Sequence, residues 1–419
     1  MFLCAFMARL LFLLLMLSQM DSDMLLSQCP DAFYYLQSAT AIREGWNFST
    51  DAIDIFGPGY PTFLALLQLL TDGNAILMML AQIILSSCGS VLLFHFAEAL
   101  TGDKRVALIA GLLNALSLTS ISLANIPLSE TLSFVMVLLG LLLFLKANET
   151  GQKRLYLGTA FALAVAALVR SANQFLFFLL PLLAWLLYPD KNKRRRRITW
   201  SLVTCAATVI LMSLWAQQFY RKHHVGGLAM SQLGGLSQMV CLTHIRIEHT
   251  TGYWARAWSD SLIREREKVV QDKSRATSDF TSEYLNRYLR ENPRELLLAY
   301  LSSVENNVHN ESGLQELQLP KWAGAFNAAW AFIFKYKLNY RVTVMAAIGC
   351  LMLLYQRKYR LLVALLLIYG YFAALAGFSM WQTSRIFYPG EIAWAVLMAV
   401  PLAALYEWVS RLFERLSHR

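Results

Sequence analysis

Four ionisable residues lie at the ends of long apolar segments or in the polar segment that follows the first of them, where their side chains could do chemistry at a membrane surface. Two are the carboxylates Asp31 and Glu130, and two are the guanidinium groups of Arg170 and Arg385. A carboxylate can accept the proton of a reacting hydroxyl, and the planar fork of arginine matches the oxygens of a phosphate. Charged groups at or inside an apolar segment are costly, so each of the four is a candidate for function.

Each of these residues also has a simpler structural interpretation. Asp31 could be the N-cap of a helix over residues 31–45, and Glu130 could be a favourable charge in the first turn of another helix. Arg170 could extend its side chain to the membrane surface, and Arg385 could bind lipid headgroups. The residue types alone leave both kinds of interpretation open.

The segments that carry these residues are apolar enough to cross a membrane. The chain has 419 residues, 57% of them hydrophobic and 15% charged, with a mean hydropathy of +0.44. A water-soluble domain of this length needs more charged surface. A helix of about 20 residues crosses the hydrocarbon core. Ten segments are candidate spans, namely residues 1–20, 75–98, 105–125, 128–146, 155–170, 173–188, 198–219, 341–355, 361–378 and 386–406.

The first apolar segment carries Arg9 near its middle. A charge there is costly in a spanning helix unless the side chain reaches the surface or finds a partner. A cleaved signal peptide is the alternative interpretation of this segment. No small-residue cleavage site follows Leu17, so we favour an uncleaved span.

Basic residues recur in every second loop, and this alternation predicts how the chain crosses the membrane. Short basic loops stay in the cytoplasm, so we expect both termini of this plasma (inner) membrane protein to be cytoplasmic. The polar segments 21–74 and 220–325 are then external. The net charge of +10 indicates contact with membrane lipid and not with nucleic acid. The basic loops are residues 104–105, 153–154, 191–197 and 357–360.

Both external segments also show helical patterns. Residues 31–45 and 280–305 place apolar side chains at helical spacing, which predicts amphipathic helices on the membrane surface. Asn292 followed by Pro293 predicts the end of one helix and the start of the next. No internal repeat or low-complexity linker divides the chain, so residues 1–419 are predicted to form a single polytopic domain.

Short motifs spread along the chain resemble the GT-C glycosyltransferases, most closely their protein-mannosyltransferase, Rgt-type and aminoarabinose-transferase branches. The resemblance covers nearly the whole chain. One departure is that Ile386 and Phe387 separate Arg385 from Tyr388, whereas a tyrosine usually follows the arginine directly in the family. The motifs are the Asp31–Tyr35 helix, Pro58-Gly59-Tyr60-Pro61, Ile126–Leu132, Leu168–Ser171, Asn292-Pro293 and Ser384–Pro389.

The resemblance implies an all-α integral membrane protein, a GT-C-like bundle of about ten transmembrane helices with amphipathic helices outside. Such enzymes move a sugar from a polyprenyl-phosphate donor to an acceptor hydroxyl, here on an envelope glycan, lipid or protein outside the cytoplasm. Some members use a divalent metal ion and others do not, so the resemblance leaves a metal open.

The resemblance also assigns roles to residues. Asp31 is expected to be the general base. Glu130 is expected to orient the acceptor, or to share a divalent ion with Asp31 if one is present. Arg170 and Arg385 are expected to bind the donor phosphate. Further contacts with the substrates are expected from the tyrosines Tyr35, Tyr60 and Tyr388.

Two other functions are compatible with a polytopic chain. The first is an O-antigen or polysaccharide polymerase or ligase, a class that usually works through arginines and histidines in external loops. The second is a non-enzymatic transporter or flippase for lipid or sugar, which would favour inverted repeats and broken helices near the membrane midplane. The sequence shows neither of those features, and its candidate charges all fall at one predicted membrane face.

Overall fold

The computed structural model describes residues 1–18, 21, 26, 29–223, 235–248, 268, 277–309, 338–379 and 384–417. Over these residues the chain forms α-helices and short 3-10 helices, and none of them lies in a strand. The prediction of an all-α protein is confirmed. Parts of the segments 21–74 and 220–325 lie outside the described residues.

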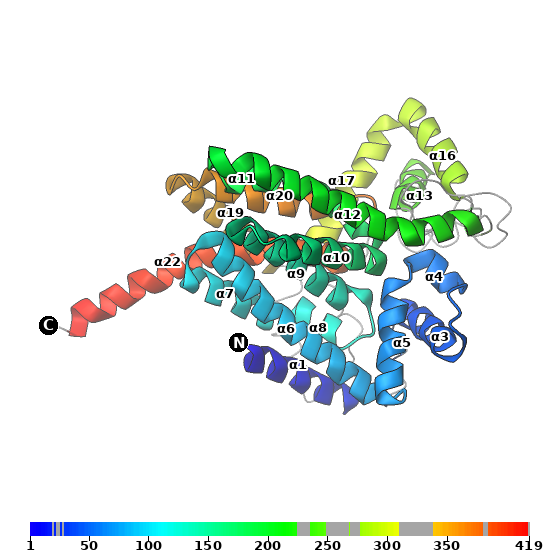
Figure 1. The fold of residues 1–419 in the computed structure, drawn as a ribbon, viewed down its shortest axis with the longest axis horizontal. Helices are drawn as coiled ribbons and strands as arrows, with labels where there is room; N and C mark the ends of the chain where they lie inside the picture. The colour runs from blue at the N-terminus through cyan, green and yellow to red at the C-terminus, as the bar shows by residue number, and fades with distance from the viewer. Residues whose placement is uncertain are drawn as a thin grey trace.

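Apolar helices lying side by side make up the body of the molecule (Figure 1). They are α1 (Phe2–Leu17), α6 (Ala75–Thr101), α7 (Lys104–Ala115), α8 (Leu118–Ala124), α9 (Ser129–Thr150), α10 (Lys153–Val169), α11 (Leu179–Leu187), α12 (Lys191–His223), α19 (Leu338–Tyr355), α20 (Tyr359–Ala376) and α22 (Glu391–Ser417). Helix α9 is central, because 78% of its apolar stretch is buried inside the protein and it packs against α6 and α10. A residue at the start of α9 is thereby placed deep inside the molecule.

Five of these helices are long and apolar enough to cross a membrane. A sixth candidate results if α7 and α8, which are bent by 52° at their break, count as one span. Each of the ten predicted segments contains a helix, but the apolar helices in residues 2–17, 171–187 and 343–355 are shorter. The chain is a multi-pass membrane protein, and the predicted number of about ten spans is not confirmed.

A second group of helices gathers at the right-hand end of the bundle, whereas the carboxyl end of α22 extends from the opposite end (Figure 1). Of this group, α17 contacts α20 and the short α21 (Ser384–Phe387). Residues 30–71 and residues 235–309 are far apart in the chain, and the helices in both ranges lie at the same end of the bundle (Figure 1). The group consists of α3 (Pro30–Gly45), α4 (Asp51–Phe56), α5 (Gly59–Thr71), α13 (Gly235–Glu248), α16 (Thr277–Glu291) and α17 (Pro293–His309).

The boundaries of these outer helices follow from proline and glycine. The helix predicted over residues 31–45 is α3, which has Pro30 at its first position. Helix α16 ends at Glu291 and α17 begins at Pro293, as the Asn292-Pro293 pair predicts. The predictions for α3 and for the boundary between α16 and α17 are confirmed. Residues 57–61 predict a turn before the next helix, but α5 already begins at Gly59, so only Gly57 and Pro58 lie outside a helix.

Candidate active site

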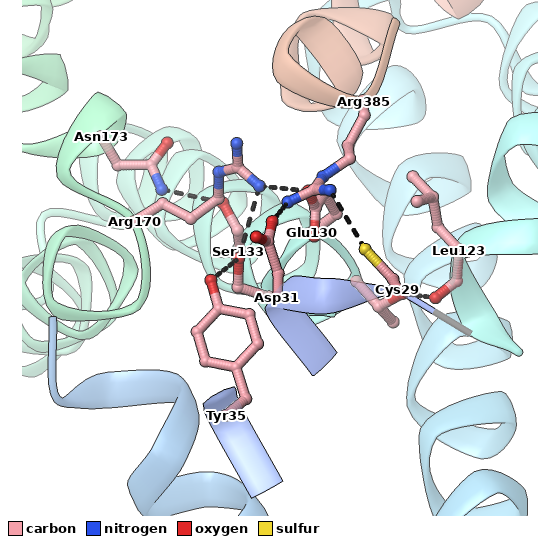
Figure 2. A network of polar contacts seen from close by, with 11 residues as sticks. Cys29, Asp31, Tyr35, Leu123, Glu130, Ser133, Arg170, Asn173 and Arg385 are labelled. Atoms are coloured by element: carbon pink, nitrogen blue, oxygen red, sulfur yellow. Dashed lines mark hydrogen bonds and ion pairs between the residues drawn. The ribbon is translucent and has the colours of Figure 1, made fainter. Parts of the chain in front are cut away.

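The four ionisable candidates meet in one cluster at the end of the bundle that carries the outer helices (Figure 2). The guanidinium of Arg385 lies between two carboxylates: its Nη2 donates to Asp31 and its Nε donates to Glu130. On the other side of Glu130, Nη1 of Arg170 lies 2.5 Å from the same carboxylate oxygen. Two positive and two negative groups therefore share one site.

Asp31 reaches this cluster from the first turn of α3. The N-cap of the helix is Cys29, in an extended conformation (φ −121, ψ 133), and Pro30 follows it. The interpretation of Asp31 as an N-cap is therefore wrong, because Pro30 occupies the first helical position and the cap is Cys29, two residues before Asp31. The Asp31 side chain is 25% exposed, so one side of this carboxylate remains open to a reactant.

Glu130 lies at the start of the central helix α9, and its side chain has no exposed surface. A buried charge is tolerated only when opposite charges and hydrogen bonds compensate its loss of water. Arg170 and Arg385 supply both to the Oε1 atom. The Oε2 atom is buried and has no hydrogen-bond partner among the described residues, which leaves one strong acceptor available inside the cluster.

The two arginines come from segments where regular helix is interrupted. Arg170 follows the last residue of α10 and has an extended backbone (φ −146, ψ 123). Arg385 lies in the short α21. Burial alone would lower the pKa of Arg385, but Glu130 and Asp31 outweigh burial and raise this pKa above its ordinary value. Arg385 is thus permanently charged, as a phosphate-binding group must be.

The predicted substrate-contacting residues Tyr35 and Tyr60 lie beneath the cluster. Their rings meet edge to face with centroids 4.9 Å apart, and their exposed fractions are 3% and 0%. The Tyr35 hydroxyl donates to Ser129 (3.4 Å), and the Tyr60 hydroxyl donates to Gln82 (2.7 Å). Burial, with Glu130 and Asp31 nearby, raises the pKa of Tyr35, so its hydroxyl stays a donor. Neither ring presents a face to a sugar in this arrangement.

Tyr388 also lies behind the cluster and not at its surface. The side chain is 1% exposed, its hydroxyl donates to Ser120 (2.8 Å), and its ring stacks on Phe134 with centroids 4.7 Å apart. Tyr388 is buried in this arrangement, and its contact with a substrate stays a prediction.

The chain shares its architecture with solved membrane glycosyltransferases. Residues 57–215 match the family model of dolichyl-phosphate-mannose-protein mannosyltransferases. The oligosaccharyltransferase of Archaeoglobus fulgidus in its apo form superimposes with a TM-score of 0.53 at 14% identity, over 91% of this chain and 47% of that one. This is a GT-C fold.

Two further structures of the Archaeoglobus fulgidus oligosaccharyltransferase show the same GT-C fold. The complex with an inhibitory peptide and a dolichol-phosphate gives a TM-score of 0.53 at 15% identity, over 93% of this chain and 47% of that one. The form tethered to an acceptor peptide gives 0.51 at 15% identity, over 90% and 45%. The chain spans less than half the length of these enzymes. No curated protein sequence matches it.

The carboxylates of this GT-C fold do not fit a divalent-cation site. Asp31 and Glu130 are bridged by Arg385, whose positive charge lies where a shared cation would need to bind. Among the described residues, no group of three His, Cys, Asp or Glu side chains is close enough to hold a metal.

Several polar residues of the cluster escaped the sequence analysis. Ser129 accepts hydrogen bonds from Tyr35 and from Arg170 (3.3 Å), and Cys29 Sγ lies 3.7 Å from Arg385 Nη1. Asn173 donates to Ser133 (2.8 Å), which holds the segment after Arg170 against α9. Ser129, Asn173 and Cys29 stand within three residues of a candidate charge, and that closeness was the only available signal.

Gly59 sets the position of Arg170 through a close contact between helices. A Cβ atom at Gly59 would lie 2.6 Å from backbone atoms of Leu168 and of Val169, at the end of α10. Only glycine therefore lets the start of α5 touch the turn that carries Arg170. This requirement explains the glycine in the Pro-Gly-Tyr-Pro motif.

We expect Gly59→Ala to push α5 away from α10 and to displace Arg170. Overpacking of this kind costs about 1–3 kcal/mol, so the variant should unfold at a lower temperature than wild type. Gly45→Ala is the matched control, because nothing lies within 4 Å of a Cβ atom there. Identical melting of Gly59→Ala and Gly45→Ala would contradict the close-contact argument.

Proposed function

We propose that this chain is a glycosyltransferase that moves a sugar from a polyprenyl-phosphate donor to an acceptor hydroxyl on the external side of the plasma membrane. The acceptor belongs to the cell envelope, as a glycan, a lipid or a protein. Asp31 is the general base, and Arg170 and Arg385 bind the donor phosphate.

The observation that carries this proposal is the bridge of Arg385 between Asp31 and Glu130, with Arg170 next to it. Two neighbouring guanidinium groups form a strong site for a phosphate. Their charge is balanced by the two carboxylates, so an incoming phosphate competes with Asp31 for Arg385. Phosphate binding then releases Asp31 to accept a proton beside the reacting sugar.

The reaction follows from these positions. The acceptor oxygen forms a bond to the anomeric carbon while the bond from that carbon to the phosphate oxygen breaks. The bonding electrons leave with the polyprenyl phosphate, and the hydroxyl proton moves to Asp31. Arg170 and Arg385 stabilise the negative charge that grows on the leaving phosphate. Glu130 keeps the two arginines in place and orients the acceptor through its remaining oxygen.

The comparisons support the class of donor. The matching family model describes enzymes that use a dolichyl-phosphate-linked mannose, and the similar oligosaccharyltransferase was solved with a dolichol-phosphate. Both lipids are polyprenyl phosphates. The sugar and the acceptor of this chain are matters for experiment.

The function is tested by transfer in membranes. Membranes that contain the chain are supplied with radiolabelled polyprenyl-phosphate sugars and envelope material, and the label in glycan, lipid and protein fractions is measured. We expect labelled product in one fraction only, and none in membranes that lack the chain. Equal labelling of both kinds of membrane would exclude the proposed activity.

We expect Arg170→Gln to raise the KM for the donor by about 10- to 100-fold, because a hydrogen bond to a charged group contributes about 1.5–3 kcal/mol. Arg154→Gln is the matched control, since Arg154 lies near the other end of α10, where its side chain donates to Gln152 (2.9 Å). An unchanged donor KM in Arg170→Gln would remove Arg170 from the phosphate site.

A further inference from the structure

A buried arginine in α1 is held entirely by neutral groups. Arg9 is 0% exposed, and each of the five N–H donors of a guanidinium has an oxygen acceptor in this structure. No described acidic side chain forms an ion pair with it. The acceptors are the hydroxyls of Ser86 and Ser120 and the carbonyls of Ala5, Asn114 and Ala115, at 2.5–3.4 Å. These hydrogen bonds offset the free-energy cost of burying the Arg9 guanidinium, so its side chain does not need to reach the membrane surface.

The hydrogen bonds of Arg9 stabilise the break between α7 and α8. Asn114 and Ala115 are the last two residues of α7, where backbone carbonyls lose their helical partners. Arg9 donates to both carbonyls and also to Ser120 of α8. One side chain therefore fixes the two halves of the bent span relative to each other.

The same serine connects this network to the candidate active site. Ser120 Oγ also accepts a hydrogen bond from the hydroxyl of Tyr388, at 2.8 Å. Tyr388 follows Arg385 by three residues, and its ring stacks on Phe134, which follows Glu130 by one turn of α9. Tyr388 therefore touches both elements that carry the Arg385–Glu130 pair.

We propose that Tyr388, held by Ser120 and Arg9, is a positioning residue that sets where Arg385 lies relative to Glu130. Its buried side chain acts through Arg385 and not on a substrate. The consequence for donor binding rests on the proposed function, but the consequence for the ion pair does not. The two can therefore be measured separately.

The ion pair is tested by a double-mutant cycle in detergent solution. Tyr388→Phe removes the hydroxyl and keeps the stacked ring. We expect Glu130→Gln to lower the melting temperature less in the Tyr388→Phe background than in wild type, because Arg385 is already displaced from Glu130. The matched background is Tyr156→Phe, which loses a buried hydroxyl bond to Asn148 (3.2 Å) at the far end of α9. There the effect of Glu130→Gln should equal that in wild type.

The donor KM provides the second measurement. We expect Tyr388→Phe, and likewise Ser120→Ala, to raise the donor KM about fivefold, the value of one hydrogen bond, and Tyr156→Phe to leave it unchanged. An equal effect of Glu130→Gln in all three backgrounds would overturn the positioning role. If the cycle showed coupling between Tyr388 and Glu130 but the wild-type chain transferred no sugar, the positioning role would stand and the proposed function would be rejected.

Discussion

Asp31→Asn is expected to lower the rate of sugar transfer by about 10²- to 10⁴-fold, the usual contribution of a general base, without raising the donor KM, because the phosphate then competes with a neutral amide for Arg385. The amide has nearly the size of the carboxylate and can still accept a hydrogen bond from Arg385. It cannot take a proton from the acceptor hydroxyl at neutral pH. The loss should therefore appear in kcat.

The measurement is kcat and donor KM for Asp31→Asn in membranes with equal amounts of protein. Glu44→Gln is the control, since Glu44 lies in the same helix and its carboxylate pairs with neighbouring Arg43 at the surface (3.1 Å). It should transfer sugar at the wild-type rate. If Asp31→Asn also transferred at that rate, another group would have to accept the proton.

Glu130, Arg170 and Arg385 could be found from the sequence because charge is rare in and beside apolar segments. Asp31 lies in the polar segment 21–74, and only the family resemblance singled it out from the other acidic residues there. The pairing of these four residues could not be predicted, since it depends on how α3, α9, α10 and α21 pack. Asp31 and Arg385 are 354 residues apart, and no local pattern relates them.

The aromatic candidates show a different limit. Tyrosine occurs in sugar-binding sites, at membrane interfaces and in protein cores, so its presence does not distinguish among these environments. Tyr35, Tyr60 and Tyr388 therefore looked like ligand-contacting residues, and their burial became evident only from the packing of α5, α6 and α9 around them. A hydroxyl that needs an internal acceptor, such as Gln82 for Tyr60, leaves no mark in the sequence.

Helix boundaries were predictable where proline sets them, as at Pro30 and Pro293. The break between α7 and α8 was not, and residues 105–125 looked like one continuous span. No proline lies at that break. It is stabilised by Ser117, which caps α8, and by Arg9 from a distant helix. A non-local hydrogen bond can thus end a helix where the local sequence would continue it.

Glu130→Gln is expected to destabilise the protein by about 3–5 kcal/mol, the cost of removing one partner from a buried ion pair. The substitution leaves Arg170 and Arg385 with Asp31 as their only carboxylate in the cluster. Glu295→Gln is the control, because the Arg246–Glu295 pair is partly exposed (25% and 30%), and such pairs contribute about 0–1 kcal/mol. Thermal unfolding in detergent should separate the two variants clearly.

The double variant Glu130→Gln/Arg170→Gln tests whether balanced charge is the cause. It removes one charge of each sign, so Arg385 and Asp31 remain as a neutral pair. We expect it to be more stable than Glu130→Gln alone, although it carries an additional substitution. Simple addition of the two losses would mean that Glu130 stabilises the fold by packing and not by charge. Recovery would establish that the two arginines are held ready for an anion by carboxylates that balance them.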